Sequence, residues 1–142
     1  AADRFDEVYD CRRAVRNGRF KYIRNYQPDK PYYMDLAYRR QMPMMQELLR
    51  LREAGALPPV TQRWFGPKPA EELYDLEKDP AELTNRAEDP AYRVPLDELR
   101  QAEQHWVRSV HDKGFMQERD LIHLFWPGGQ LPATAPPQFT HT

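Results

Sequence analysis

The chain has 142 residues, 30% of them charged, and a net charge of −1. This length suits one domain with a single core, and the charge excludes a bulk field that attracts nucleic acid or an anionic membrane. A lone cysteine, Cys11, excludes an internal disulfide framework, and no apolar run approaches the roughly 18 residues of a membrane span. The opening residues are too acidic for a signal peptide and lack a start methionine, so we expect a piece of a longer protein.

Residues 11–26 predict a β-hairpin that follows a lead-in without a clear period. An Asn-Gly pair at residues 17–18 divides two strand-like runs, and this pair is preferred in two-residue type I′ turns. With that turn, Val15 would lie opposite Phe20, and both would share a face with Tyr22. Neither face is purely polar, so we expect the hairpin to be covered on both sides.

The middle of the chain alternates between proline-rich connections and short elements. Residues 27–38 indicate an ordered loop, and Pro43 opens a helix predicted over residues 43–54, with Gly55 as its left-handed terminator. Residues 57–69 contain four prolines, which indicates extended chain.

A strand is predicted at residues 72–76, where the apolar run includes Leu73 and Tyr74. The next residues carry helix-start signals, because Asp79 suits an N-cap, Pro80 suits the first helical position and an acidic residue follows. We therefore predict a short helix over residues 80–87.

The clearest amphipathic pattern predicts a helix over residues 96–113, in which apolar residues recur at steps of three and four. A short apolar cluster follows at residues 121–126 and would cap the core as a helix or a strand. We expect residues 127–142, rich in proline and threonine, to form a loosely ordered tail.

Two patterns resemble one known family. The pattern LYDLxxDPxExxNxA at residues 73–87 resembles the segment that closes the C-terminal subdomain of type I sulfatases, in the style of the N-sulfoglucosamine-sulfohydrolase-like and arylsulfatase branches. The pattern RxVRxGxFKYIxN at residues 13–25 resembles the preceding hairpin of that family. Arg86 departs from it, since leucine usually follows the asparagine.

The resemblance, which covers residues 9–114, implies an α+β fold. A small antiparallel sheet of about four strands would pack against a long C-terminal helix, as in the C-terminal subdomain of an alkaline-phosphatase-like sulfatase. Residues 1–126 would form this subdomain. Its main partner would be the missing N-terminal catalytic domain of the same enzyme.

The resemblance also implies a nucleophile and a metal for the parent enzyme. Sulfatases of this type oxidise the cysteine of a Cys-x-Pro-x-Arg sequence to formylglycine and hold calcium with Asp and Asn side chains. Cys11 does not match, because Arg13 stands where the proline should be and Val15 where the arginine should be. We expect Cys11 to be structural, and we expect no catalytic residue, metal site or cofactor in this chain.

Other candidate sites have simpler explanations. His105 and His111 are six residues apart and would lie on different sides of a helix, which does not favour zinc. The acidic residues near 71–72 and 118–120 suit a solvated surface better than a glycosidase pair. Ser109 has no glycine elbow, and neither has Thr84.

The hairpin itself is rich in cations that alternate with aromatic rings, a combination that suits sulfate, phosphate or stacked bases. In the ordinary interpretation these cations pair with carboxylates of the missing half. In the functional one they form a rim that holds a sulfated carbohydrate, with Arg13, Arg16 and Lys21 as candidate substrate-binding residues. The net charge and the lack of an RNP-type motif argue against nucleic acid. The cations are Arg12, Arg13, Arg16, Arg19, Lys21 and Arg24.

The sequence thus predicts the C-terminal subdomain of a sulfatase, a hydrolase of sulfuric esters or sulfamates. It would support the catalytic domain, shape the edge of the substrate cleft and be inactive alone. The alternative is a stand-alone sulfated-carbohydrate or anion-binding module. In isolation we expect an apolar, arginine-studded face to cause self-association.

Overall fold

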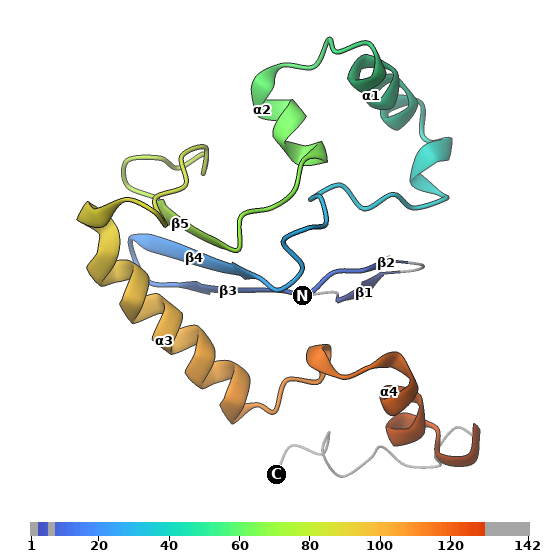
Figure 1. Cartoon of the computed structure of the whole chain (residues 1–142), viewed down its shortest axis with the longest axis vertical. Coiled ribbons are helices and arrows are strands. Elements are labelled where there is room, and N and C mark those ends of the chain that lie inside the picture. The colour runs from blue at the N-terminus through green and yellow to red at the C-terminus, as the bar shows by residue number, and fades with distance from the viewer. Residues whose placement is uncertain (1–2, 6–7, 130–142) are drawn as a thin grey trace.

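The computed structural model describes residues 3–5 and 8–129, and it places a small antiparallel sheet beside a long helix (Figure 1). This arrangement confirms the α+β fold class. Helix α3 covers one face of the sheet, and α2 lies over the other. The helices and strands are, in chain order, β1 (Arg4–Phe5), β2 (Val8–Tyr9), β3 (Arg12–Arg16), β4 (Phe20–Asn25), α1 (Pro43–Glu53), α2 (Pro59–Gln62), β5 (Glu71–Asp75), α3 (Arg93–Ser109) and α4 (Glu118–Phe125).

The main sheet has the strand order β3-β4-β5, and neighbouring strands are antiparallel. Within the described ranges it contains three strands, while β1 and β2 form a separate two-stranded ladder in the segment expected to be an irregular lead-in. Because β4 is central, it joins the two sequence patterns. Tyr22 lies opposite Val15 of β3 on one side and opposite Leu73 of β5 on the other.

The hairpin turn differs from the predicted type I′ turn. The Asn17 N–H donates to the Phe20 carbonyl at 3.0 Å, so Gly18 and Arg19 form the two-residue connection. Neither Asn17 nor Gly18 has the positive φ that a type I′ turn requires. Instead, the Asn17 side-chain oxygen accepts the N–H groups of Arg19 at 3.0 Å and Phe20 at 2.6 Å. A local side-chain bond therefore stabilises the turn.

The changed turn places Val15 opposite Tyr22 instead of Phe20. A shift of two residues leaves every side chain on its original face, whereas a shift of one would reverse them all. The prediction that Val15, Phe20 and Tyr22 share a face is therefore confirmed, and that face packs against α3. The buried residues of this core are Tyr22, Leu73, Leu96 and Leu99.

A second apolar cluster joins α1, the loop before it and the 3₁₀ turn Arg63–Phe65 that follows α2. These segments lie above the sheet in the view of Figure 1. The Tyr33 ring of that loop lies 5.2 Å from the Trp64 ring and 5.1 Å from the Phe65 ring, centroid to centroid. Met45 of α1 is buried against them. Helix α1 ends at Glu53, and the left-handed terminator is confirmed because Gly55 has φ +65°.

The helix predicted over residues 80–87 is wrong. Glu82 has φ +55°, which no α-helix accommodates, and the Asp79 carboxylate accepts the Thr84 N–H at 2.7 Å across a loop. The Asn85 side chain accepts the Leu73 N–H at 2.9 Å and donates to the Glu71 carbonyl at 3.0 Å. The short segment therefore gains bonds to the edge of β5, which outweigh those of an isolated helical turn.

Helix α3 begins and ends earlier than the predicted span of residues 96–113. It includes Pro95, because the N–H groups of a first helical turn have no intrahelical partner for proline to remove. It ends at Ser109, and His111 follows with φ +49°.

The apolar cluster at residues 121–126 belongs largely to α4. Of the predicted tail, Pro127–Gly129 form a 3₁₀ turn, and residues 130–142 lie outside the described part of the chain. Among the helices of the described ranges, none combines the length and apolar character that a membrane crossing requires.

Candidate functional site

The cations of the hairpin are mostly paired within this chain, not left for carboxylates of a missing half. This corrects the ordinary interpretation of the basic hairpin. Arg16 is exposed and forms no ion pair with any residue that the structure describes. The pairs, with their nitrogen–oxygen distances, are Arg12–Asp10 at 3.3 Å, Arg13–Asp3 at 2.5 Å, Arg19–Asp75 at 2.6 Å, Lys21–Glu82 at 2.7 Å and Arg24–Glu71 at 3.4 Å.

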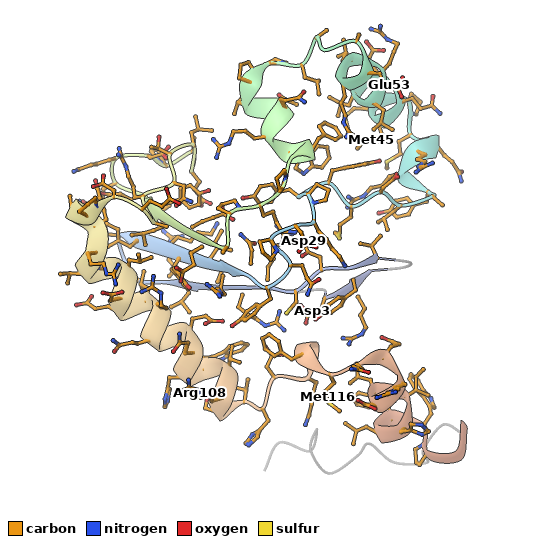
Figure 2. All side chains as sticks on the ribbon, viewed as in Figure 1. Asp3, Asp29, Met45, Glu53, Arg108 and Met116 are labelled. Atoms are coloured by element: carbon orange, nitrogen blue, oxygen red, sulfur yellow. The ribbon has the colours of Figure 1, made fainter. Side chains whose placement is uncertain are left out.

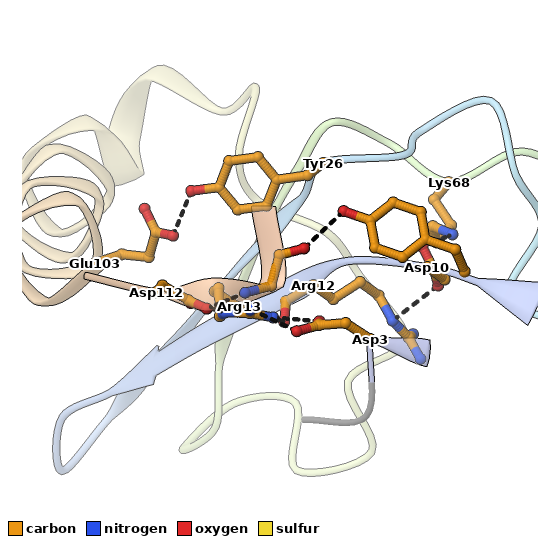
Figure 3. Close-up of polar contacts among 10 residues, drawn as sticks. Asp3, Asp10, Arg12, Arg13, Tyr26, Lys68, Glu103 and Asp112 are labelled. Carbon is orange, nitrogen blue, oxygen red and sulfur yellow. Dashed lines mark hydrogen bonds and ion pairs between the residues drawn. The ribbon is translucent and has the colours of Figure 1, made fainter. Parts of the chain in front are cut away.

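Arg13 is the most deeply held of these cations, with 7% of its side chain exposed (Figure 3). Its guanidinium donates to both Asp3 oxygens, at 2.5 and 2.7 Å, and to both Asp112 oxygens, one of them at 2.8 Å. It also donates to the Arg12 carbonyl at 2.8 Å. These hydrogen bonds, first those to Asp112, raise the pKa of Arg13.

The predicted substrate role does not fit Arg13, because its donors are committed to two carboxylates. Asp112 lies 99 residues away in sequence, so no local pattern reveals this contact. We name the set Arg13, Asp3 and Asp112 the arginine clamp. It ties the N-terminal segment, β3 and the chain after α3 to one another.

Arg16 and Lys21 lie together, directly opposite each other on β3 and β4. They occupy the sheet face turned away from α3, because their neighbours Val15 and Tyr22 face that helix. Both Glu82 oxygens accept from the Lys21 ammonium, at 2.9 and 2.7 Å. The structure thus brings together two of the three predicted site residues and places Arg13 on the opposite face.

The same face contains an aromatic hollow of about 280 Å³, lined by Tyr32, Trp64 and Tyr74 among others. Its buried carboxylate is Glu72, which accepts the Tyr74 hydroxyl at 2.5 Å and the Asn25 amide at 2.6 Å. Such pairing satisfies a carboxylate that would otherwise be costly to bury.

A second hollow, of about 380 Å³, lies between β4 and α3. Sequence reasoning missed it, because its lining comes from segments about 80 residues apart. One feature of the sequence could have indicated it: Arg100, Gln104 and Arg108 are spaced four residues apart, which places them on one side of a helix. We call this space the α3–β4 hollow. Its lining includes Tyr22, Arg24, Tyr26, Glu71, Arg100, Glu103, Gln104 and Arg108.

The two acids of the α3–β4 hollow are both held by neighbours. Arg100 donates to the two Glu71 oxygens at 2.7 and 2.9 Å, and the Tyr22 hydroxyl donates to Glu71 at 2.6 Å. These bonds lower the pKa of Glu71 to about 2. Glu103, 1% exposed, accepts the Tyr26 hydroxyl at 2.6 Å (Figure 3).

The low carboxyl pKa values predict that stability falls in acid. Hydrogen bonds from Arg100 to Glu71 and from Arg19 to Asp75 hold each pKa at about 2, below the ordinary values of 4.5 and 3.8. The unfolded chain therefore takes up these protons first, so their contribution is complete above about pH 5 and is lost as the pH falls towards about 2. Urea unfolding midpoints measured between these limits should fall, and Glu71→Gln should reduce the slope. An unchanged slope in that variant would contradict the assignment.

Cys11 is fully buried, and burial raises the pKa of its thiol to about 11. At neutral pH it is an uncharged thiol with little nucleophilic character. Neither its surroundings nor its sequence fits a formylglycine precursor. Within the described ranges, no group of three or more His, Cys, Asp or Glu side chains is arranged to hold a metal ion. The residues that the structure describes therefore do not fit the calcium and formylglycine implied for the parent enzyme.

No protein-family model matches the chain. The chain is similar to the Ulvan-active sulfatase of Formosa agariphila, with 46% identity over 140 residues. The alignment covers 97% of this chain and 24% of that protein, so the chain spans about a quarter of the length of this relative. The two sequence patterns and the sheet–helix fold agree with this similarity to a sulfatase. The chain is therefore similar, over nearly its whole length, to about a quarter of a sulfatase, which agrees with the resemblance of its two patterns to the C-terminal subdomain of that family.

Proposed function

We propose that residues 1–126 form a supporting, catalytically inactive subdomain of an enzyme that hydrolyses sulfate esters on ulvan or a similarly sulfated carbohydrate. The observation that carries this proposal is the 46% identity, which extends over nearly the whole chain to part of a sulfatase active on ulvan. The fold supports it as well. The Asn85 side chain of the family pattern fastens the loop after β5 to that strand, which is a structural use of the motif.

Arg16 and Lys21 are the residues that we propose for the edge of the substrate cleft. The Arg16 guanidinium is exposed and offers planar donors that suit a sulfate group. Lys21 is about a third exposed, and Glu82 holds its ammonium beside Arg16. This pair would contribute to substrate binding, not to bond cleavage.

The chemical groups that cleave the ester would come from the N-terminal catalytic domain. Cys11 supports this division of labour, because a buried thiol with a raised pKa is a poor nucleophile. Calcium and formylglycine would be bound and formed in that partner domain.

The partner domain would also cover exposed apolar side chains. Trp106 and Val110 at the end of α3 are about half exposed, and so are Ile122 and Trp126 in and after α4. Large apolar side chains left exposed in this way are candidates for an interaction surface. In the isolated chain, the same side chains would promote self-association.

The test compares this chain alone with the chain joined to its N-terminal catalytic portion. We expect the isolated chain to self-associate in sedimentation velocity and to release no sulfate from ulvan or an aryl sulfate. The joined protein should be less associated and should release sulfate. Its control replaces the cysteine of Cys-x-Pro-x-Arg with alanine. Sulfate release by the isolated chain would overturn the proposal, and an upstream coding sequence without that motif would favour the stand-alone binding module.

A further inference from the structure

The α3–β4 hollow lies between one row of side chains at β4 and another along α3. Arg24 lies on β4, and Tyr26, two residues further on, follows the end of that strand; both line the hollow. Arg100, Gln104 and Arg108 recur every fourth residue along α3 and so lie on one side of it. Packing of α3 on the sheet brings these two rows to opposite sides of one space of about 380 Å³. Figure 2 shows Arg108 near the C-terminal end of α3.

Two guanidinium groups of this space keep hydrogen-bond donors available. Arg24 contacts Glu71 only at 3.4 Å and lies 5.7 Å from the centre of the Tyr26 ring, without a hydrogen bond to any described residue. Arg108 is exposed and has no ion-pair partner in the described part of the chain. Gln104 is exposed beside them and adds an amide.

The acids of the hollow do not cancel this charge. Arg100 neutralises Glu71 through a two-point contact, and Tyr22 donates to the same carboxylate. Glu103 is covered and accepts the Tyr26 hydroxyl. Three arginines therefore face two glutamates that already have partners, which leaves a net positive, polar space.

We propose that the α3–β4 hollow binds a sulfated sugar residue, with Arg24 and Arg108 on the sulfate and Gln104 on a ring hydroxyl. Planar guanidinium groups form paired, charge-assisted hydrogen bonds with oxyanions, and a space of this volume lies within the range of small-ligand sites. The choice of a sulfated sugar, instead of a free anion, rests on the proposed sulfatase function. None of the three predicted substrate-binding residues lines this hollow: Arg16 and Lys21 occupy the other face of the sheet, and Arg13 is held in the arginine clamp.

The test is calorimetric titration of the 142-residue chain with a heparin disaccharide. We expect saturable binding, and we expect Arg24→Ala and Arg108→Ala each to weaken it about tenfold, since each removes charge-assisted hydrogen bonds. Arg93→Ala is the matched control, because it removes an arginine of the same helix that lies outside the hollow and pairs with Asp97. Raising the salt concentration should weaken binding of the wild type.

Two further titrations define the ligand. The chemically desulfated disaccharide and inorganic phosphate should both bind more weakly than the sulfated disaccharide. Equal binding of either one would overturn the proposal, as would undiminished binding by the Arg108→Ala variant. Two-dimensional NMR spectra of each variant check that the fold persists. These titrations do not depend on sulfate release, so a failure of the hollow is distinguishable from a failure of the sulfatase assignment.

Discussion

Replacing Arg13 with alanine is expected to lower the free energy of unfolding by about 3–5 kcal/mol, the typical cost of removing one partner from a buried ion pair. The clamp carboxylates of Asp3 and Asp112 are only 14% and 10% exposed. Without the guanidinium, both would remain largely buried and would lose their main charged partner. Urea denaturation followed by far-UV circular dichroism measures the change.

Arg16→Ala provides the matched control for Arg13→Ala. It removes an arginine from the same strand, but this side chain is exposed and has no ion pair with described residues, so we expect a change within about 0.5 kcal/mol. Arg13→Lys should recover only part of the loss, because an ammonium cannot make the two planar contacts. Similar effects of Arg13→Ala and Arg16→Ala would show that the clamp is not stabilising.

Gly114 lies directly against the arginine clamp. A Cβ atom built on Gly114 would meet the Arg13 guanidinium and the Asp3 carboxylate, both held in place by their mutual bonds. The reason for glycine at this position is close approach, not a positive φ.

Leu73→Ala is expected to cost about 2–5 kcal/mol, the range for a leucine truncated in a well-packed core. Leu73 is fully buried, and it lies in the core between β4 and α3 with Tyr22, Leu96 and Leu99. Its loss would leave a cavity at the centre of the sheet–helix interface. The same denaturation experiment measures the cost, and the apolar side chains around the cavity should bind a hydrophobic dye more readily near the midpoint.

The control for this truncation is Leu83→Ala, in the loop that follows β5. Leu83 is 50% exposed, so its replacement removes less apolar surface from water and should cost less than about 1 kcal/mol. If both leucines cost the same, α3 would not pack on β5 in the way that the structure describes.

The sequence was informative wherever a local signal governed the structure. The alternation of Val15, Phe20 and Tyr22 identified the buried face of the hairpin, even though the turn chemistry was different from the predicted one. Side chains alternate between the two faces of a strand, so a two-residue error in the register leaves each of them on the predicted face. Gly55 ended α1 as expected, because a left-handed terminator depends on a single residue.

Local signals failed where distant chain segments supplied the partners. Asp79-Pro80 is a good helix start, yet the residues after it bond to the edge of β5 instead. Arg13 belonged to the predicted cationic rim, yet its partners lie at Asp3 and Asp112. After Asp79-Pro80, contacts with β5 outweighed a capping preference worth about 1 kcal/mol.

By itself, the sequence determined the buried face of the hairpin, because a period of two is a property of neighbouring residues, and it carried the two patterns whose family resemblance implied the fold class. Only the tertiary structure decided which cations are committed and which remain available. Arg13 is held in a clamp, Arg16 is open, and Arg24 and Arg108 share a hollow. Ion pairs form between any segments that packing brings within a few ångströms, and the order of residues along the chain does not specify that proximity.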